Sequence, residues 1–234
     1  MNPLSGRKAL ITGGGSGVGK AIAEALVLEG VDVVIVSRRQ KLLDETAAEL
    51  NRQKRGKAYA VACDIRKAAE VRAAVSFALG KLSRIDFLIN NSGLGVQSKI
   101  VDCSEEDWDM VVETNLKGAF LMTREVLPGM IQQKSGYIIN IASQAAKYGY
   151  AKAGPYCASK FGLVGFGEAL QEEVREHGIR VHSLCPALIQ VPKPTQAEAI
   201  QHGVLQVDDI VAAILFLLKQ PPHVKIENIG LYHF

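Results

Sequence analysis

The sequence predicts a single α/β domain built as a doubly wound parallel sheet with helices on both faces. Strand-like and helix-like segments alternate along the chain, the strands are continuous apolar runs, and a glycine-rich loop follows the first strand. Apolar runs such as 33–36 and 138–141 are typical of parallel strands, which are covered on both faces. At 234 residues and 48% hydrophobic content, one domain spanning residues 1–234 can bury a sizeable core.

The first strand is expected at 8–12 and the first helix at 21–28, with the loop Gly13-Gly14-Gly15-Ser16-Gly17-Val18-Gly19 between them. A strand, a glycine loop and a helix form the start of a nucleotide-binding unit, in which the helix N-terminus binds a pyrophosphate. The spacing fits neither G-x-G-x-x-G nor a P-loop. A flexible turn is the alternative interpretation.

The next strands are expected at 31–36, 58–62, 85–89, 137–141 and 181–184, and two of them end in polar residues. Asn90-Asn91-Ser92-Gly93 follows one strand, and Ser143 follows another. Ligands bind at the carboxyl ends of the strands in an open parallel sheet. These side chains are therefore candidates for one site.

Tyr156 and Lys160 lie four residues apart at the start of the long helix expected from Pro155 to about His177. Proline suits the first helical position, so both side chains lie on one face near the helix N-terminus. An ammonium and the helix dipole both stabilise a phenolate, which tunes a tyrosine for general acid/base chemistry. Taken alone, a tyrosine and a lysine at this spacing are usually two solvated surface residues.

Taken together, these motifs resemble the short-chain dehydrogenase/reductase family from about Gly6 to the C-terminus. The matching residues are Thr12 through Gly19, Asn90-Asn91-Ser92-Gly93, Asn115, Ser143 and Tyr156-x-x-x-Lys160. Ser92 stands where the family usually has alanine. The resemblance implies a Rossmann-type fold. The end of the chain, 221–229, looks more like the branch of 3-hydroxy acid dehydrogenases and sepiapterin-type reductases than like ketoacyl-carrier-protein reductases.

The resemblance also implies a mechanism. Tyr156 would protonate the carbonyl oxygen during reduction, and Ser143 would hold that oxygen by a hydrogen bond. Lys160 would lower the pKa of the tyrosine and bind the nicotinamide ribose. Asn115 would hold a water that links the lysine to solvent. The catalytic residues implied are thus Asn115, Ser143, Tyr156 and Lys160.

The turn after the second strand, Ser37-Arg38-Arg39, favours NADP(H) over NAD(H). It lacks an acidic residue that would bind the ribose of NAD, and guanidinium groups pair well with a 2′-phosphate. A solvated basic loop is the alternative. The cofactor-binding residues implied are Gly13, Gly15, Ser16, Gly17, Val18, Gly19, Ser37, Arg38, Arg39, Asp64, Ile65, Asn91, Ser92, Gly93, Tyr156, Lys160, Pro186, Ala187 and Ile189.

The C-terminal third departs from the family pattern. Ala187 replaces a usual glycine, and Val191 stands where a threonine would contact the cofactor amide. Valine makes no side-chain hydrogen bond, so nicotinamide positioning would rest on backbone groups. The substrate-lid region, about 187–207, is short and contains Pro192 and Pro194, which predicts an open or partly formed substrate cleft.

Net charge, apolar runs, cysteines and histidines limit the binding partners and the cellular location that the sequence predicts. A net charge of +3 does not indicate a nucleic-acid or membrane partner, and no apolar run reaches membrane-spanning length. Four dispersed cysteines indicate free thiols in the cytoplasm, and the five histidines show no metal-ligand spacing. Small residues lie along the 155–177 helix, and the resemblance implies a homodimer or homotetramer, because family members commonly pair this helix across a subunit interface.

The leading hypothesis is an NADP-dependent oxidoreductase for a small ketone or secondary alcohol, of the 3-oxo acid, 3-hydroxy acid or diketone class. Reduction of a 3-oxoacyl thioester is the alternative within enzymes. An NADP-sensing binding protein is the alternative outside them.

Overall fold

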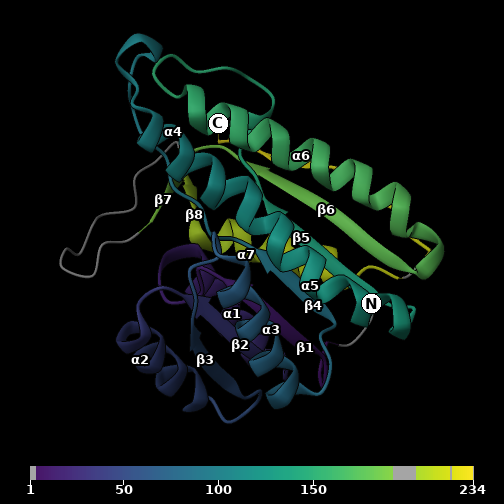
Figure 1. The fold of residues 1–234 in the computed structure, drawn as a ribbon. Coiled ribbons are helices and arrows are strands. Elements are labelled where there is room, and N and C mark those ends of the chain that lie inside the picture. The colour runs from purple at the N-terminus through teal and green to yellow at the C-terminus, as the bar shows by residue number, and fades with distance from the viewer. Residues whose placement is uncertain (1–3, 192–203, 222, 234) are drawn as a thin grey trace.

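The computed structural model describes residues 4–191, 204–221 and 223–233. These residues form a sheet of seven parallel strands in the order β3-β2-β1-β4-β5-β6-β9 (Figure 1). The strands are β1 (Lys8–Thr12), β2 (Asp32–Ser37), β3 (Ala58–Ala62), β4 (Phe87–Asn90), β5 (Gly136–Ile141), β6 (Ile179–Pro186) and β9 (Ile229–Leu231). Because the strand order reverses between β1 and β4, the carboxyl ends of these two strands open a crevice for a ligand. The predicted fold class is confirmed.

Helices cover both faces of the sheet (Figure 1). One face packs against α1 (Gly17–Leu28), α2 (Gln40–Asn51) and α7 (Val207–Leu218). The other face packs against α3 (Ala68–Leu82), α5 (Gly118–Gln133) and α6 (Gly154–Val174). Strands β1 to β5 supply both cores in alternation: Ala9 and Ile11 of β1 face the first core, and Leu10 faces the second. This alternation explains the continuous apolar runs inside these strands.

A π-helical turn interrupts the long helical stretch that runs from α4 (Glu105–Val112) into α5. The turn spans Glu113–Lys117 and contains Asn115, which is buried. Single π turns inside α-helices occur frequently at functional sites. The extra residue in this turn brings Asn115 against the loop that follows β4, where its side chain bonds to Leu94.

The glycines of α6 have different surroundings within the chain. A Cβ on Gly162 would lie 2.8 Å from the Leu116 side chain, and one on Gly167 would lie 3.0 Å from the Ser183 hydroxyl. Only at Gly165, of these three positions, would an added Cβ meet open space. Close packing within one chain therefore accounts for Gly162 and Gly167, and it does not test the subunit contact that the resemblance implies for this helix.

The helix ends follow local sequence. Pro155 lies in the first turn of α6, and Gly178 ends the short 3₁₀ turn Arg175–His177 with a φ of +69°. Glycine is the residue that adopts this left-handed conformation without strain. Within the described residues, no helix is long and apolar enough to cross a bilayer. Much of the expected lid, 192–203, lies outside the described residues.

Candidate active site

The glycine loop between β1 and α1 is shaped for close backbone approach. A Cβ on Gly19 would lie only 2.3 Å from the carbonyl oxygen of Gly13, and Gly13 itself has a φ of +69°. Ser16 precedes α1 without making a side-chain cap, and the first turn contains no acidic residue. The first N–H groups of the helix are therefore available to an anionic ligand such as a pyrophosphate.

A cavity of about 680 Å³ extends from this loop across the carboxyl ends of β1, β2, β3 and β4. It brings together most of the predicted cofactor residues: Gly13, Gly15, Ser16, Val18, Gly19, Ser37, Arg38, Arg39, Asp64, Ile65, Asn91, Ser92 and Gly93. Cys63, Arg66, Leu94 and Thr114 also line it and were not predicted. The position of Cys63 and Arg66 on either side of Asp64-Ile65 could have indicated them. The size and lining of this cavity fit a dinucleotide.

Three hydrogen bonds join the residues after β4 to Thr12 at the end of β1, next to the glycine loop. The hydroxyl of Thr12 accepts from the N–H groups of Asn91 and Ser92, both at 3.0 Å. The side-chain amide of Asn91 donates to the carbonyl oxygen of Thr12 at 2.9 Å. The Asn91 side chain therefore joins the carboxyl ends of β1 and β4, between which the crevice lies.

The far end of the cavity is basic. Arg38 and Arg39 are exposed, and Arg66 forms a bidentate ion pair with Asp64 through Nη2–Oδ2 at 2.6 Å and Nε–Oδ1 at 2.9 Å. The Arg66 hydrogen bond is the main cause that lowers the pKa of Asp64 to about 2, with a smaller contribution from Arg38. This end therefore carries three guanidinium groups and one paired carboxylate.

Ser143, Tyr156 and Lys160 lie together at the carboxyl edge of β5. Ser143 follows that strand and begins the 3₁₀ turn Gln144–Ala146, and its hydroxyl accepts from the N–H of Ala145 at 3.1 Å. Tyr156 lies in the first turn of α6. A Cβ on Gly95 would lie 3.3 Å from the tyrosine ring, so the loop after β4 packs closely beside the phenol.

Lys160 is buried, with 3% of its surface exposed. Its Nζ donates to the carbonyl oxygen of Ile141 at 2.7 Å and lies 5.6 Å from the centroid of the Tyr156 ring. Burial lowers the pKa of Lys160 to about 8. A lysine with this pKa can exchange a proton near neutral pH.

The described contacts of Lys160 do not test the role predicted for it. Burial raises the pKa of Tyr156, and a hydrogen bond with the Ser143 side chain opposes this rise. The ammonium of Lys160 donates to the carbonyl oxygen of Ile141. Lowering the pKa of Tyr156 through Lys160 remains a proposal.

Asn115 makes three hydrogen bonds with its side chain. Its Nδ2 donates to the carbonyl oxygen of Leu94 at 2.8 Å and to the Ser159 hydroxyl at 2.9 Å, and its Oδ1 accepts from the N–H of Leu94 at 2.9 Å. Both amide hydrogens are therefore used, and one lone pair of Oδ1 is left. Through these hydrogen bonds, Asn115 fixes the loop after β4 beside Lys160.

Pro186 at the end of β6 and the described residues 187–191 do not line the cavity. Pro186 and Ala187 are buried, and the N–H of Ala187 donates to Leu231 at 2.8 Å. Ile189 begins the two-residue strand β7 (Ile189–Gln190), which pairs with β8 (Leu205–Gln206). Gly17 also lies outside the lining, although a Cβ there would lie 3.2 Å from Val191. The N–H of Ala187 is thus already used within the fold.

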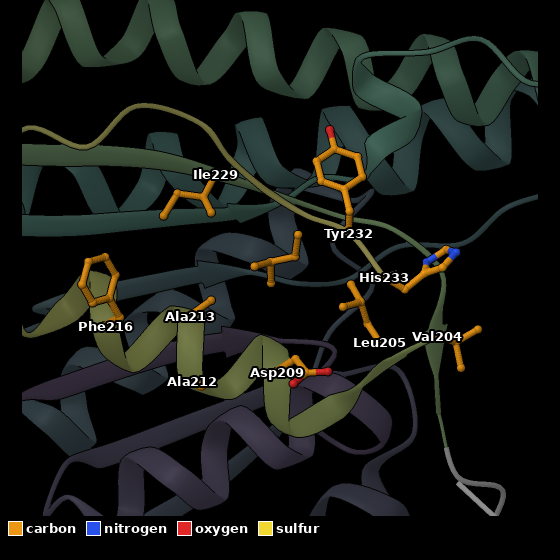
Figure 2. A pocket seen from close by; sticks show the side chains of 10 residues that line it. Val204, Leu205, Asp209, Ala212, Ala213, Phe216, Ile229, Tyr232 and His233 are labelled. Atoms are coloured by element: carbon orange, nitrogen blue, oxygen red, sulfur yellow. The ribbon is translucent and has the colours of Figure 1, made fainter. Parts of the chain in front are cut away.

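A second cavity, of about 700 Å³, lies between α7 and β9 and contains none of the candidate residues (Figure 2). Ala213 and Phe216 of α7 form one wall, and Ile229 and Tyr232 form the opposite wall. The described residues contain no group of three or more His, Cys, Asp or Glu side chains arranged for a metal ion.

Comparison with known proteins agrees with this geometry. The family model for short chain dehydrogenases matches residues 7–201. The chain belongs to the short-chain dehydrogenase/reductase family. A putative ketoacyl reductase of the granaticin polyketide synthase from Streptomyces violaceoruber is 38% identical over 206 residues, which cover 86% of this chain and 74% of that protein.

Two solved structures of this family are similar over almost the whole chain. A metagenomic short-chain oxidoreductase in complex with NADP is 31% identical, with a TM-score of 0.86 and 98% of both chains covered. An alcohol dehydrogenase from Thermococcus sibiricus complexed with 5-hydroxy-NADP is 25% identical, with a TM-score of 0.88 and 97% and 96% covered. As a member of this family, the chain is a nicotinamide-dependent oxidoreductase that acts on CH–OH groups.

Proposed function

We propose that this short-chain dehydrogenase/reductase uses NADP(H) to interconvert a small ketone and its secondary alcohol, with Tyr156 as general acid/base. The observation that carries the proposal is the placement of Ser143, Tyr156 and buried Lys160 at one strand edge beside the dinucleotide cavity. The 3-oxo acid, 3-hydroxy acid and diketone classes are the substrates to test first.

NADP(H) is favoured by the charge at the far end of the cavity. Arg38 and Arg39 would hold the 2′-phosphate, and the ion pair with Arg66 balances the negative charge of Asp64 that would otherwise repel it. The glycine loop and the free N-terminus of α1 would hold the pyrophosphate. NADP in one solved relative and 5-hydroxy-NADP in another support this choice.

In the proposed reduction, the substrate carbonyl oxygen lies between the Ser143 hydroxyl and the Tyr156 phenol. The bound nicotinamide supplies the hydride. Tyr156 donates its proton to the carbonyl oxygen as negative charge develops there, and Ser143 stabilises that charge by a hydrogen bond. Lys160 would return a proton toward the phenolate and bind the nicotinamide ribose. The residues assigned to catalysis are Asn115, Ser143, Tyr156 and Lys160, with Asn115 as a positioning residue.

A Tyr156→Phe variant tests the proposal. NADPH oxidation is measured against small ketones, diketones, 3-oxo acids and 3-oxoacyl thioesters, and NADPH binding is measured by fluorescence. The variant is expected to lose turnover at least a thousandfold while its dissociation constant for NADPH changes less than threefold. Tyr232→Phe, in the C-terminal segment and exposed, is the matched control. Turnover that survives in Tyr156→Phe would overturn the role of the tyrosine.

Reduction of a 3-oxoacyl thioester is the second candidate, and similarity to the putative ketoacyl reductase of Streptomyces violaceoruber favours it. Activity confined to the thioester members of the panel would select it. An NADP-sensing protein without turnover is the alternative outside enzymes. NADPH binding with no turnover on any member of the panel would select that alternative.

We also propose that the enzyme is a homodimer or homotetramer of the reducing cytoplasm. Trp108, Phe120 and Phe161 are at least 40% exposed on α4, α5 and α6, and a second copy would cover them. The four cysteines are free thiols, three of them buried, as expected where disulfides do not form. Light scattering after gel filtration tests the oligomeric state, and a monomer at micromolar concentration would contradict it.

A further inference from the structure

We propose that a cavity at the amino-terminal edge of the sheet binds a small oxyanion of the phosphate or carboxylate type. The cavity has a volume of about 200 Å³ and lies where β4, β5 and β6 begin, at the edge opposite Ser143 and Tyr156. Leu4 from the start of the chain and Leu218 at the end of α7 close its apolar sides. This site is independent of the proposed NADP(H) function.

Positive charge in this cavity exceeds negative charge. Arg7, Lys134 and Arg180 line it, and Asp86 is the one carboxylate among the described lining residues. Asp86 is buried, and it pairs with Arg7 at 3.2 Å and with Arg84. One carboxylate shared by two arginines has no charge left to balance Lys134 and Arg180.

Arg180 is a half-buried cation with unused donors. Its Cζ lies 3.6 Å from the centroid of the Tyr137 ring, and its Nη1 donates to the carbonyl oxygens of Gln220 and Pro221 at 3.2 and 2.9 Å. Its Nε and Nη2 have no acceptor, and it forms no ion pair, within the described part of the chain. Burial lowers the pKa of Arg180, and the charge of Arg7 adds a smaller contribution in the same direction.

The Tyr137 hydroxyl supplies a further donor. Tyr137 lines the cavity and is 4% exposed, and its hydroxyl has no hydrogen-bond partner among the described residues. Burial raises the pKa of this phenol, so it keeps its proton at neutral pH. A buried unpaired donor is costly unless a partner enters the site.

These features together favour the binding of an anion. A guanidinium offers donors in a fixed plane that suits a phosphate or a carboxylate, and the phenol adds a third direction. The alternative is that Arg180 only caps the carbonyl groups after α7. That role uses Nη1 alone and leaves the other donors and the Tyr137 hydroxyl unexplained.

Thermal unfolding of the full chain in inorganic phosphate, against chloride at equal ionic strength, tests the proposal. Phosphate is expected to raise the melting temperature in a saturable way, and acetate is titrated in parallel to tell the two oxyanion sources apart. Arg180→Gln should weaken the phosphate dissociation constant about tenfold or more, and Tyr137→Phe about fivefold. Arg175→Gln, at an exposed ion pair after α6, is the matched control.

Tyr137→Phe keeps the test decisive if Arg180→Gln fails to fold, because it removes only an unpaired hydroxyl. Arg38→Gln tests the cofactor cleft as the source of the effect. A saturable shift that both cavity variants weaken more than Arg38→Gln does, and that Arg175→Gln leaves unchanged, supports the site. No saturable shift, equal affinity in Tyr137→Phe and wild type, or an effect lost only in Arg38→Gln would overturn it.

Discussion

Arg66 holds Asp64 by both carboxylate oxygens, with Nη2 2.6 Å from Oδ2 and Nε 2.9 Å from Oδ1. The pair lies in the wall of the dinucleotide cavity, where an unpaired carboxylate would repel a 2′-phosphate. In the sequence a single isoleucine separates Asp64 from Arg66. That spacing alone does not show that the two side chains form an ion pair.

Arg66→Gln is expected to weaken NADPH binding about three- to tenfold and to change NADH binding less, because it frees the charge of Asp64. Dissociation constants for both cofactors, measured by fluorescence, check this. Arg72→Gln on the exposed surface of α3 is the control. In an Asp64→Asn background, Arg66→Gln should no longer alter the ratio of the two constants. An unaltered ratio in the single variant would contradict the electrostatic argument.

Replacing Arg38 and Arg39 together by serine should raise the NADPH dissociation constant about 10- to 100-fold, since charge-assisted hydrogen bonds contribute about 1.5–3 kcal/mol. NADH, which lacks the 2′-phosphate, should bind almost as before. Isothermal titration with each cofactor measures both values, and Arg52→Ser serves as control. Equal weakening of NADH binding and NADPH binding would show that the two arginines stabilise the turn and do not bind the 2′-phosphate.

Lys160→Met should remove activity but raise the free energy of unfolding at pH 7 by about 1–3 kcal/mol, because the protein pays to bury the ammonium. The pKa of Lys160 is about 8 in the fold and about 10.4 in an unfolded chain. Below pH 8 both states are protonated and the cost is complete. Between pH 8 and 10.4 the unfolded state holds more protons, so wild-type stability rises toward that of the variant.

Denaturant unfolding at pH 7, 9 and 10 measures this effect, with Lys41→Met at an exposed position of α2 as control. The difference between wild type and Lys160→Met should shrink as the pH increases. A difference that stays constant across this range would show that burial of Lys160 carries no such cost.

Gly19→Ala should destabilise the protein by about 1–3 kcal/mol and weaken cofactor binding, because the added methyl would lie 2.3 Å from the Gly13 carbonyl. Gly80→Ala in α3 is the matched control, since nothing lies within 4 Å of its added Cβ. That substitution should stabilise the protein by about 0.5–1 kcal/mol. Thermal unfolding and NADPH titration measure both variants, and similar behaviour of the two would refute the steric argument.

Much of the site could be predicted from local sequence. The strand before Gly13, the proline before Tyr156 and the helical spacing to Lys160 are short-range patterns, and each depends on neighbours in the chain. The contacts of Asn115 could not be predicted, because a π turn determines where its side chain points. The same holds for Lys160, whose ammonium bonds to Ile141 on another element.

The sequence by itself determined the fold class, the glycine loop and the residues available for chemistry, because strand and helix periodicity and turn formation are local properties. Only the tertiary structure decided which of those residues share a site and how each is charged. Asp64 is paired with Arg66, Tyr156 is desolvated beside Ser143, and Arg180 lies over the Tyr137 ring with no ion pair to a described residue. Desolvation and ion pairing depend on distances between separate elements, and the folded chain sets those distances.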